Sequence, residues 1–281
     1  MRVIYQQPSA FADQDHSATL LLQDTSVFDN DEGMQPHVKS GRAQLVRGDT
    51  LVLGDVRYVW GKATDYGRVV DYVVFTTGKS SSTRDVQVTL LTTSSFVGAA
   101  LGKPAFDPFR GFTTNPPNLL TKAILNVLCT IPNSVPQPKF IAATSIIVAD
   151  SMIAKAKPFL RPIFGLPIQS LNTVRKLHMD WLGIERVLAH GSGRPWGDEE
   201  PQAKVTTVDR IKWQDRKGLP SPGSLEILVL RPKSIIERWV QVERPNEATH
   251  TISREEVAHF ITETAMKNWN LCKDIAVVVR Y

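Results

Sequence analysis

The sequence contains very little cysteine: Cys129 and Cys272 are the two cysteines among 281 residues. Two cysteines cannot build a disulfide framework or a four-cysteine zinc site. The sequence also lacks an apolar run of the roughly 18 to 20 residues that cross a bilayer, and its first residues lack the apolar core of a secretory signal. It therefore predicts a soluble, cytoplasmic protein with no membrane partner.

Several catalytic signatures are missing as well. The sequence contains no H-E-x-x-H, no G-x-S-x-G and no G-x-x-x-x-G-K-[ST] motif, and its six histidines form no cluster with the spacing of metal ligands. Metalloenzyme, serine hydrolase and kinase chemistry are therefore unsupported, and we expect no metal site.

Charge is unevenly distributed along the chain. Residues 1–35 hold one base and six acids, so the other 246 residues hold 32 of the 33 bases and 22 of the 28 acids. The basic residues are scattered singly and do not alternate with aromatic residues. This pattern is typical of a solvated basic surface and predicts no nucleic-acid partner.

From about residue 40, short β-branched runs alternate with stretches of helical periodicity. The expected strands are 43–47, 69–75, 139–148, 225–231 and 275–280. The expected helices lie near 54–64, after the Asn115-Pro116-Pro117 start signal, over 172–190 and after Ser253, whereas 79–114 looks irregular and 191–223 looks like a long loop. The alternation predicts an α/β fold with a doubly wound, mostly parallel sheet covered by helices on both faces.

In such sheets, ligands bind outside the carboxyl ends of the strands. The candidate binding residues at these ends are Thr76, Thr77, Gly78, Thr144, Ser145 and Arg231. Gly78 would let a ligand approach the strand closely, or it is simply a turn glycine. Arg231 would bind a phosphate or a substrate acid, or it forms a structural ion pair with a C-terminal carboxylate.

Six stretches at these strand ends and helices carry a family resemblance. They are LVRGD at 45–49, VDYVVFTTG at 70–78, PNLL at 117–120, LGIERVLAH at 182–190, VLRP at 229–232 and TISREEVAHF at 251–260. Together they resemble fungal NmrA-like atypical short-chain dehydrogenase/reductases of the averufin-oxidase type. The resemblance implies one Rossmann-like domain over 36–281, with NAD or NADP beside Thr76, Thr77, Gly78 and Thr144. It also implies a small-molecule substrate held by 151–223 and 233–270.

Residues 1–35 depart from this family pattern. The family opens with a strand that runs into a G-x-x-G-x-x-G turn, whose glycines let the backbone approach the cofactor pyrophosphate. Here 1–4 resembles the front of that strand, but no glycine precedes Gly33 and Pro8 removes an amide donor. The segment 17–23 is a candidate replacement strand. Either the chain has lost dinucleotide affinity or this segment comes from a mis-assigned exon, and the sequence leaves both explanations open.

The usual proton-transfer pair is also missing from its expected place. Short-chain reductases use a tyrosine whose phenol is acidified by a lysine four residues later. This spacing occurs at Tyr58 and Lys62, ahead of the wrong strand, which favours a chance match. The expected helix over 172–190 has no tyrosine. Lys176 and His178 are the ionisable candidates in this helix. The resemblance adds Ser145, so the catalytic candidates are Ser145, Lys176 and His178.

Two functions fit these observations. One is an NAD(P)-dependent oxidoreductase that modifies a polyketide-derived molecule in secondary metabolism. The other is a catalytically inactive, NmrA-like relative that binds a ligand or a protein and has lost dinucleotide binding. The family's usual role favours the first function, whereas the missing glycine turn and the missing tyrosine–lysine pair favour the second.

Overall fold

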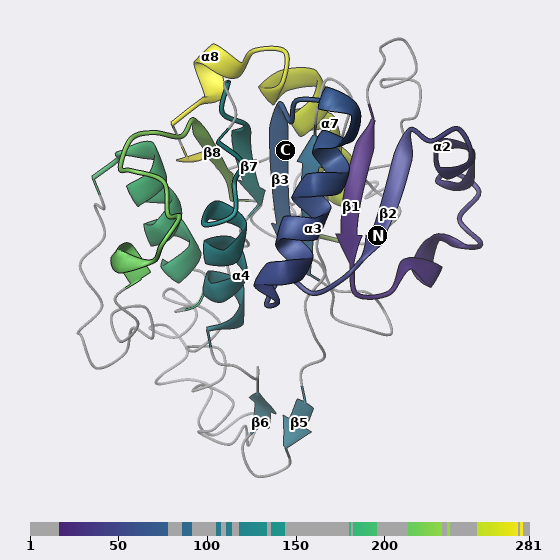
Figure 1. Ribbon diagram of the computed structural model, residues 1–281, viewed down its shortest axis with the longest axis horizontal. Helices are drawn as coiled ribbons and strands as arrows, with labels where there is room; N and C mark the ends of the chain where they lie inside the picture. Colours follow the sequence, from purple (N-terminus) through teal and green to yellow (C-terminus); the bar gives the residue numbers. More distant parts are fainter. Residues whose placement is uncertain are drawn as a thin grey trace, which may run out of the picture.

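One seven-stranded sheet forms the centre of the protein (Figure 1). The computed structural model describes residues 17–77, 86–91, 105–107, 111–113, 118–133, 136–143, 180, 182–195, 213–231, 235–236, 252–274 and 276–277. The sheet strands are β1 (Ala18–Leu22), β2 (Ala43–Arg47), β3 (Tyr72–Thr77), β4 (Val86–Leu91), β7 (Lys139–Ala143), β8 (Ile227–Leu230) and β11 (Ala276–Val277). Their spatial order is β11-β8-β7-β3-β4-β1-β2.

Every pair of neighbours in this sheet is parallel except the two pairs that contain β4. The parallel pairs are β1 with β2, β3 with β7, β7 with β8 and β8 with β11. β4 is antiparallel to β1 on one side and to β3 on the other. The structure thus confirms the predicted Rossmann-like, doubly wound and mostly parallel α/β fold, with one reversed strand near its middle.

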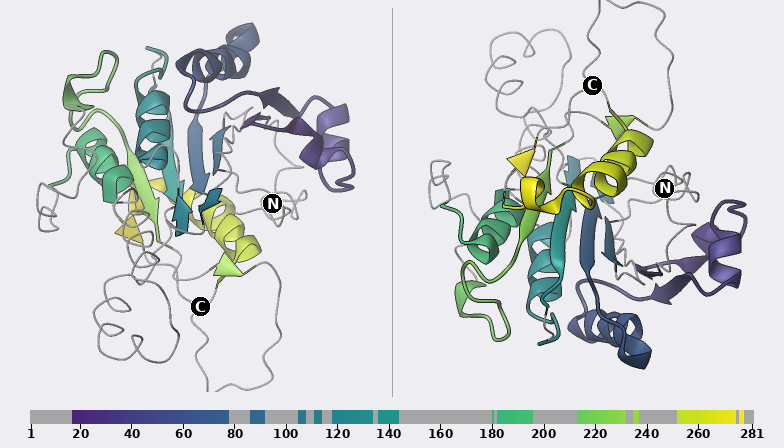
Figure 2. Two further views of the ribbon diagram at one scale, coloured as in Figure 1. Left: turned by 90° about the horizontal axis from the view of Figure 1, so that it is seen from below. Right: turned by 90° about the horizontal axis from the view of Figure 1, so that it is seen from above.

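Helices cover both faces of the sheet (Figure 2). On one face lie α3 (Leu53–Thr64), α4 (Leu119–Leu128) and a helix over residues 182–192. On the other face lie α7 (Arg254–His259), the π-helical turn η6 (Phe260–Ala265) and α8 (Trp269–Cys272). The smaller elements are η2 (Thr25–Phe28), α2 (Gln35–Lys39), η3 (Asp65–Gly67), β5 (Ala105–Asp107), β6 (Gly111–Thr113), η5 (Trp213–Asp215), β9 (Ile235–Ile236) and β10 (Ile252–Ser253).

The core is built by the alternation of side chains along the central strands. In β3, Val73 and Phe75 pack with α3 and α4, whereas Val74 packs on the opposite face with α7 and η6. Because both faces are buried, each of these strands needs a continuous apolar run rather than an alternating one. A third, smaller cluster joins β1 to η2 and α2 through Leu20 and Phe28.

Most of the predicted elements are confirmed, although their bounds shift. The predicted strand 43–47 is β2, the helix near 54–64 is α3, and 225–231 contains β8. The predicted strand 69–75 begins and ends later, as β3. Beyond Ala143 the predicted strand 139–148 lies outside the described residues, as do residues 172–179 of the predicted helix 172–190.

Several expectations need correction. The helix expected after Asn115 begins at Leu119, and the helix expected to end at 190 continues to 192. The predicted irregular span 79–114 contains β4, β5 and β6. The predicted long loop 191–223 buries Trp213 against His190, whose ring centroid lies 5.1 Å away. The segment 17–23, a candidate to replace the first strand of the family, does contain a strand, β1. Its neighbours in the sheet are β2 and β4.

None of the helices within the described ranges combines the length and the apolar character needed to cross a membrane.

We predict that Gly218→Ala destabilises the protein by about 2 kcal/mol, because the backbone at this position is left-handed and a new Cβ would clash. Gly218 has a φ of +88°, and its Cβ would lie 2.4 Å from the carbonyl oxygen of Cys129. Gly61→Ala is the matched control: it lies inside α3 with open space around it, so it should stabilise by about 0.5 to 1 kcal/mol. Urea unfolding measures both, and equal effects would contradict the prediction.

Candidate functional site

The parallel strands β1, β2, β3, β7 and β8 all end at one edge of the sheet, which we call the carboxyl edge (lower edge in Figure 1). α3 and α4 begin at this edge and run back along the sheet. In doubly wound sheets the ligand site lies here, at the point where the strand order reverses. In this protein the order reverses around β4, since β1 and β2 lie on one side of it and β3, β7 and β8 on the other.

At the reversal point, the chain direction of β4 decides what reaches the carboxyl edge. Val86, the first residue of β4, pairs with Thr77, the last residue of β3, and β4 ends opposite Tyr72. The chain therefore enters β4 at the carboxyl edge and leaves it at the opposite edge. A parallel strand in this position would instead deliver a turn and a helix N-terminus to the ligand site.

At the end of β2, the chain's own carboxylates bind the turn that leads into α3. The backbone amide of Asp49 donates to Oδ2 of Asp55 at 2.8 Å, and the amide of Leu51 donates to Oδ1 of Asp49 at 2.8 Å. A Cβ on Gly48 would lie 2.9 Å from Asp55 Cβ and 2.9 Å from Leu21 Cδ1. Side chains of the protein thus fill the space beside this strand-end glycine.

At the start of α4, a buried carboxylate takes the free amides of the helix. Asn118 precedes the helix but makes no capping hydrogen bond. Instead, Asp180 accepts hydrogen bonds from the amides of Leu120 and Thr121, at 2.8 and 2.9 Å, and from Oγ1 of Thr121 at 2.6 Å. These bonds compensate groups that would otherwise be buried without partners. They also place negative charge at the positive end of the helix dipole.

Asp180 is 2% exposed. Burial raises the pKa of its carboxyl group above the ordinary value, while the bonds from Thr121 and Leu120 and the charge of Lys122 act in the opposite direction. The carboxylate is therefore an internal partner of α4 rather than a group presented to solvent.

At the end of β8, Arg231 forms a two-point ion pair with Glu185. Nε of Arg231 donates to Oε1 of Glu185 at 2.9 Å, and Nη2 donates to Oε2. The Glu185 side chain is 12% exposed and that of Arg231 is 33% exposed. An ion pair at Arg231 is therefore present, as one of the two predicted alternatives has it, and this partner belongs to the helix over 182–192.

The structure describes few of the other predicted site residues. Thr76 and Thr77 are the last two residues of β3, at the carboxyl edge, and Thr76 pairs with Ala143 of β7. Their role in cofactor binding stays a prediction. The remaining candidates, Gly78, Thr144, Ser145, Lys176 and His178, lie outside the described residues.

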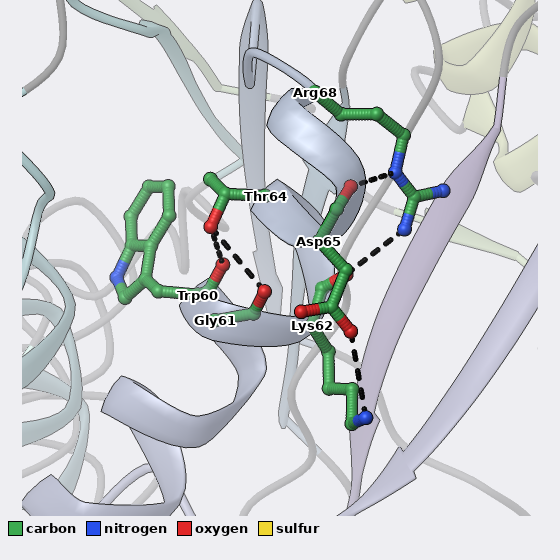
Figure 3. A network of polar contacts seen from close by, with 6 residues as sticks. All are labelled: Trp60, Gly61, Lys62, Thr64, Asp65 and Arg68. Atoms are coloured by element: carbon green, nitrogen blue, oxygen red, sulfur yellow. Dashed lines mark hydrogen bonds and ion pairs between the residues drawn. The ribbon is translucent and has the colours of Figure 1, made fainter.

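The tyrosine–lysine spacing in α3 belongs to a solvent-facing helix surface. Tyr58 is 58% exposed, and Nζ of Lys62 lies 5.6 Å from its ring centroid. Lys62 also pairs with Asp65 at 3.4 Å, next to the Arg68 side chain, which donates to two carbonyl groups at the end of α3 (Figure 3). This arrangement closes the helix C-terminus and supports the interpretation of the spacing as a chance match.

We tested whether these residues fit the pyrophosphate of a nicotinamide dinucleotide. Such a group needs unoccupied backbone amides at a helix N-terminus beside the reversal point. Within the described part of the chain, the amides of Leu120 and Thr121 at the start of α4 are bonded to Asp180, and those of Asp49 and Leu51 before α3 are bonded to Asp55 and Asp49. β4 runs antiparallel to both of its neighbours. The described residues do not fit a pyrophosphate held in the usual way.

The sequence interpretation missed the three residues that define this edge: Asp180, Thr121 and Glu185. Asp180 and Thr121 are polar residues within otherwise apolar helical surfaces, which is the signal that could have identified them. Their pairing spans 59 positions, and sequence spacing cannot reveal such a contact. Among the described residues, no three histidine, cysteine, aspartate or glutamate side chains gather as metal ligands.

The sequence matches no protein-family model and no curated protein. A comparison with solved structures finds two distant similarities. One is an alcohol dehydrogenase from the archaeon Thermococcus sibiricus complexed with 5-hydroxy-NADP, with 13% identity over 99% of this chain and 92% of that chain and a TM-score of 0.47. The other is a short-chain dehydrogenase/reductase (glucose/ribitol dehydrogenase) from Brucella melitensis, with 12% identity over 95% and 96% and a TM-score of 0.43. The fold assignment here rests on the strand order, not on these distant similarities.

We predict that Asp180→Ala lowers the free energy of unfolding by about 3 kcal/mol, because it leaves the amides of Leu120 and Thr121 buried without their acceptor. The Thr121 hydroxyl keeps the backbone carbonyl of residue 180 as an acceptor. Asp29→Ala is the control, since Asp29 is exposed and its replacement should change stability by about 0.5 kcal/mol at most. Chemical denaturation measures both variants. Similar values for the two would show that Asp180 does not hold α4.

Proposed function

We propose that this protein is an oxidoreductase-like Rossmann protein that binds a small organic molecule at the carboxyl edge without a nicotinamide dinucleotide. The observation that carries this proposal is the antiparallel β4 at the reversal point. Asp180 supports it, because its carboxylate occupies the amides of Leu120 and Thr121 at the start of α4, where a phosphate would bind. The protein would then act as a catalytically inactive ligand-binding relative of the NmrA-like proteins that the sequence resembles.

A second candidate is an active NAD(P)-dependent oxidoreductase that modifies a polyketide-derived substrate. The parallel strands β3, β7 and β8 favour it, because they end together at one edge as the strands of a dinucleotide site do. This candidate needs a parallel strand and a glycine turn in the place that β4 occupies. Transcript sequencing across the codons for residues 1–40 would reveal an alternative first segment with that turn.

We predict no thermal shift with NADPH or NADH up to millimolar concentration. A ligand present at 100 times its dissociation constant stabilises the folded state by about 2.7 kcal/mol, which would raise the melting temperature of a domain of this size by about 5 to 10 °C. A short-chain dehydrogenase that binds NADPH serves as the positive control. A saturable shift with either dinucleotide would overturn the proposed function and favour the second candidate.

A further inference from the structure

The half of the carboxyl edge formed by β3, β7 and β8 contains charged groups of both signs. Arg231 pairs with Glu185 through two hydrogen bonds. At the start of α4, Lys122 lies close enough to Asp180 to lower its pKa. Both of these cations therefore lie near a carboxylate of the same chain.

The pair of Arg231 and Glu185 is the part of this network that stands at a strand end. Arg231 directly follows β8, so its side chain lies at the edge where a ligand would bind. Glu185 comes from the helix over 182–192, whose Ile184, Val187 and Leu188 are packed into the core with Ile227 and Val229. The helix is thus fixed on the sheet, and it holds the Glu185 carboxylate against the guanidinium.

We propose that Glu185 determines the charge of the ligand: by occupying Arg231, it excludes carboxylate- and phosphate-bearing molecules and leaves this half of the site to uncharged ones. The proposal rests on the proposed function, in which the carboxyl edge binds a small organic molecule. It also reverses the sequence-based assignment of Arg231 as a residue that binds a substrate acid.

Two physical effects produce the exclusion. A ligand carboxylate can bind the guanidinium fork only by displacing Glu185, whose side chain is 12% exposed. The displaced carboxylate would then be largely buried without its partner, which is strongly unfavourable. A ligand carboxylate that leaves the pair intact meets a guanidinium whose charge Glu185 already neutralises, so it gains little electrostatic attraction. An uncharged ligand meets neither penalty.

The test compares two probes that share one ring system, 2-(hydroxymethyl)anthraquinone and anthraquinone-2-carboxylate, by calorimetric titration of the full chain at pH 7. We expect the wild-type protein to bind the neutral probe at least about tenfold more tightly. Glu185→Gln removes the negative charge and keeps the side-chain shape, so it should reduce this ratio by about tenfold through tighter binding of the carboxylate. In the double variant that combines Glu185→Gln with Arg231→Gln, the tighter binding of the carboxylate probe should be lost.

The matched control is Glu263→Gln. Glu263 lies on η6, on the opposite face of the sheet, and its replacement breaks an ion pair with Lys267. It should leave the ratio unchanged. Equal or tighter binding of the carboxylate by the wild-type protein would overturn the proposal, as would no binding of the neutral probe, or an unchanged ratio in Glu185→Gln. The wild-type ratio alone decides the matter if Glu185→Gln fails to fold. Binding of NADPH would overturn the proposed function instead, because the charge ratio does not depend on it.

Discussion

The position between β1 and β3 constrains the rest of the structure. Backbone amides and carbonyls on both strands face this position, and in a sheet covered on both faces they cannot be satisfied by water, so a strand must fill it. β4 fills it in the antiparallel direction and pairs with both neighbours. This pairing completes the sheet and closes the core. Because β4 begins at the carboxyl edge and ends at the opposite edge, it brings no helix N-terminus to the carboxyl edge. Within the described residues, the Rossmann-like sheet is thus completed by a strand that runs antiparallel to its neighbours.

The electrostatics of the carboxyl edge follow the same principle. Helix N-termini and arginine side chains are the groups with which proteins of this architecture bind anions. Here Asp180 occupies the start of α4, Asp55 binds the turn before α3, and Glu185 occupies Arg231. Two of these three contacts join segments far apart in the sequence, and together they place carboxylates of the chain on groups that could bind an anion. This arrangement is the basis for the proposal that the edge binds an uncharged molecule.

The sequence was sufficient to predict the architecture because the signal lies in periodicity. The apolar runs of β3, β7 and β8 and the helical spacing in α3 and α4 are local properties, and they predicted a parallel sheet with helices on both faces. The sequence of β4 alternates apolar and polar residues from Val86 to Leu90, a strand signal that the interpretation of 79–114 as irregular missed. Its direction was not predictable, because alternation does not fix direction and pairing depends on an empty position elsewhere in the sheet. The partners of Asp180 and Glu185 were missed for a related reason, since each contact joins segments about 46 to 60 positions apart. Local sequence patterns predict individual helices and strands, whereas the site depends on which of these elements pack together.

Hydrogen exchange of the amides in residues 86–91 tests the central claim most directly. If β4 occupies the position between β1 and β3, these amides are bonded inside the sheet and should exchange as slowly as those of β3. Protection matching that of residues 72–77 is the result that this account predicts. Exchange at the rate of an unstructured peptide, with β1 and β3 still protected, would contradict it, because the reversal point would then be open to another strand and to the glycine turn that such a strand brings.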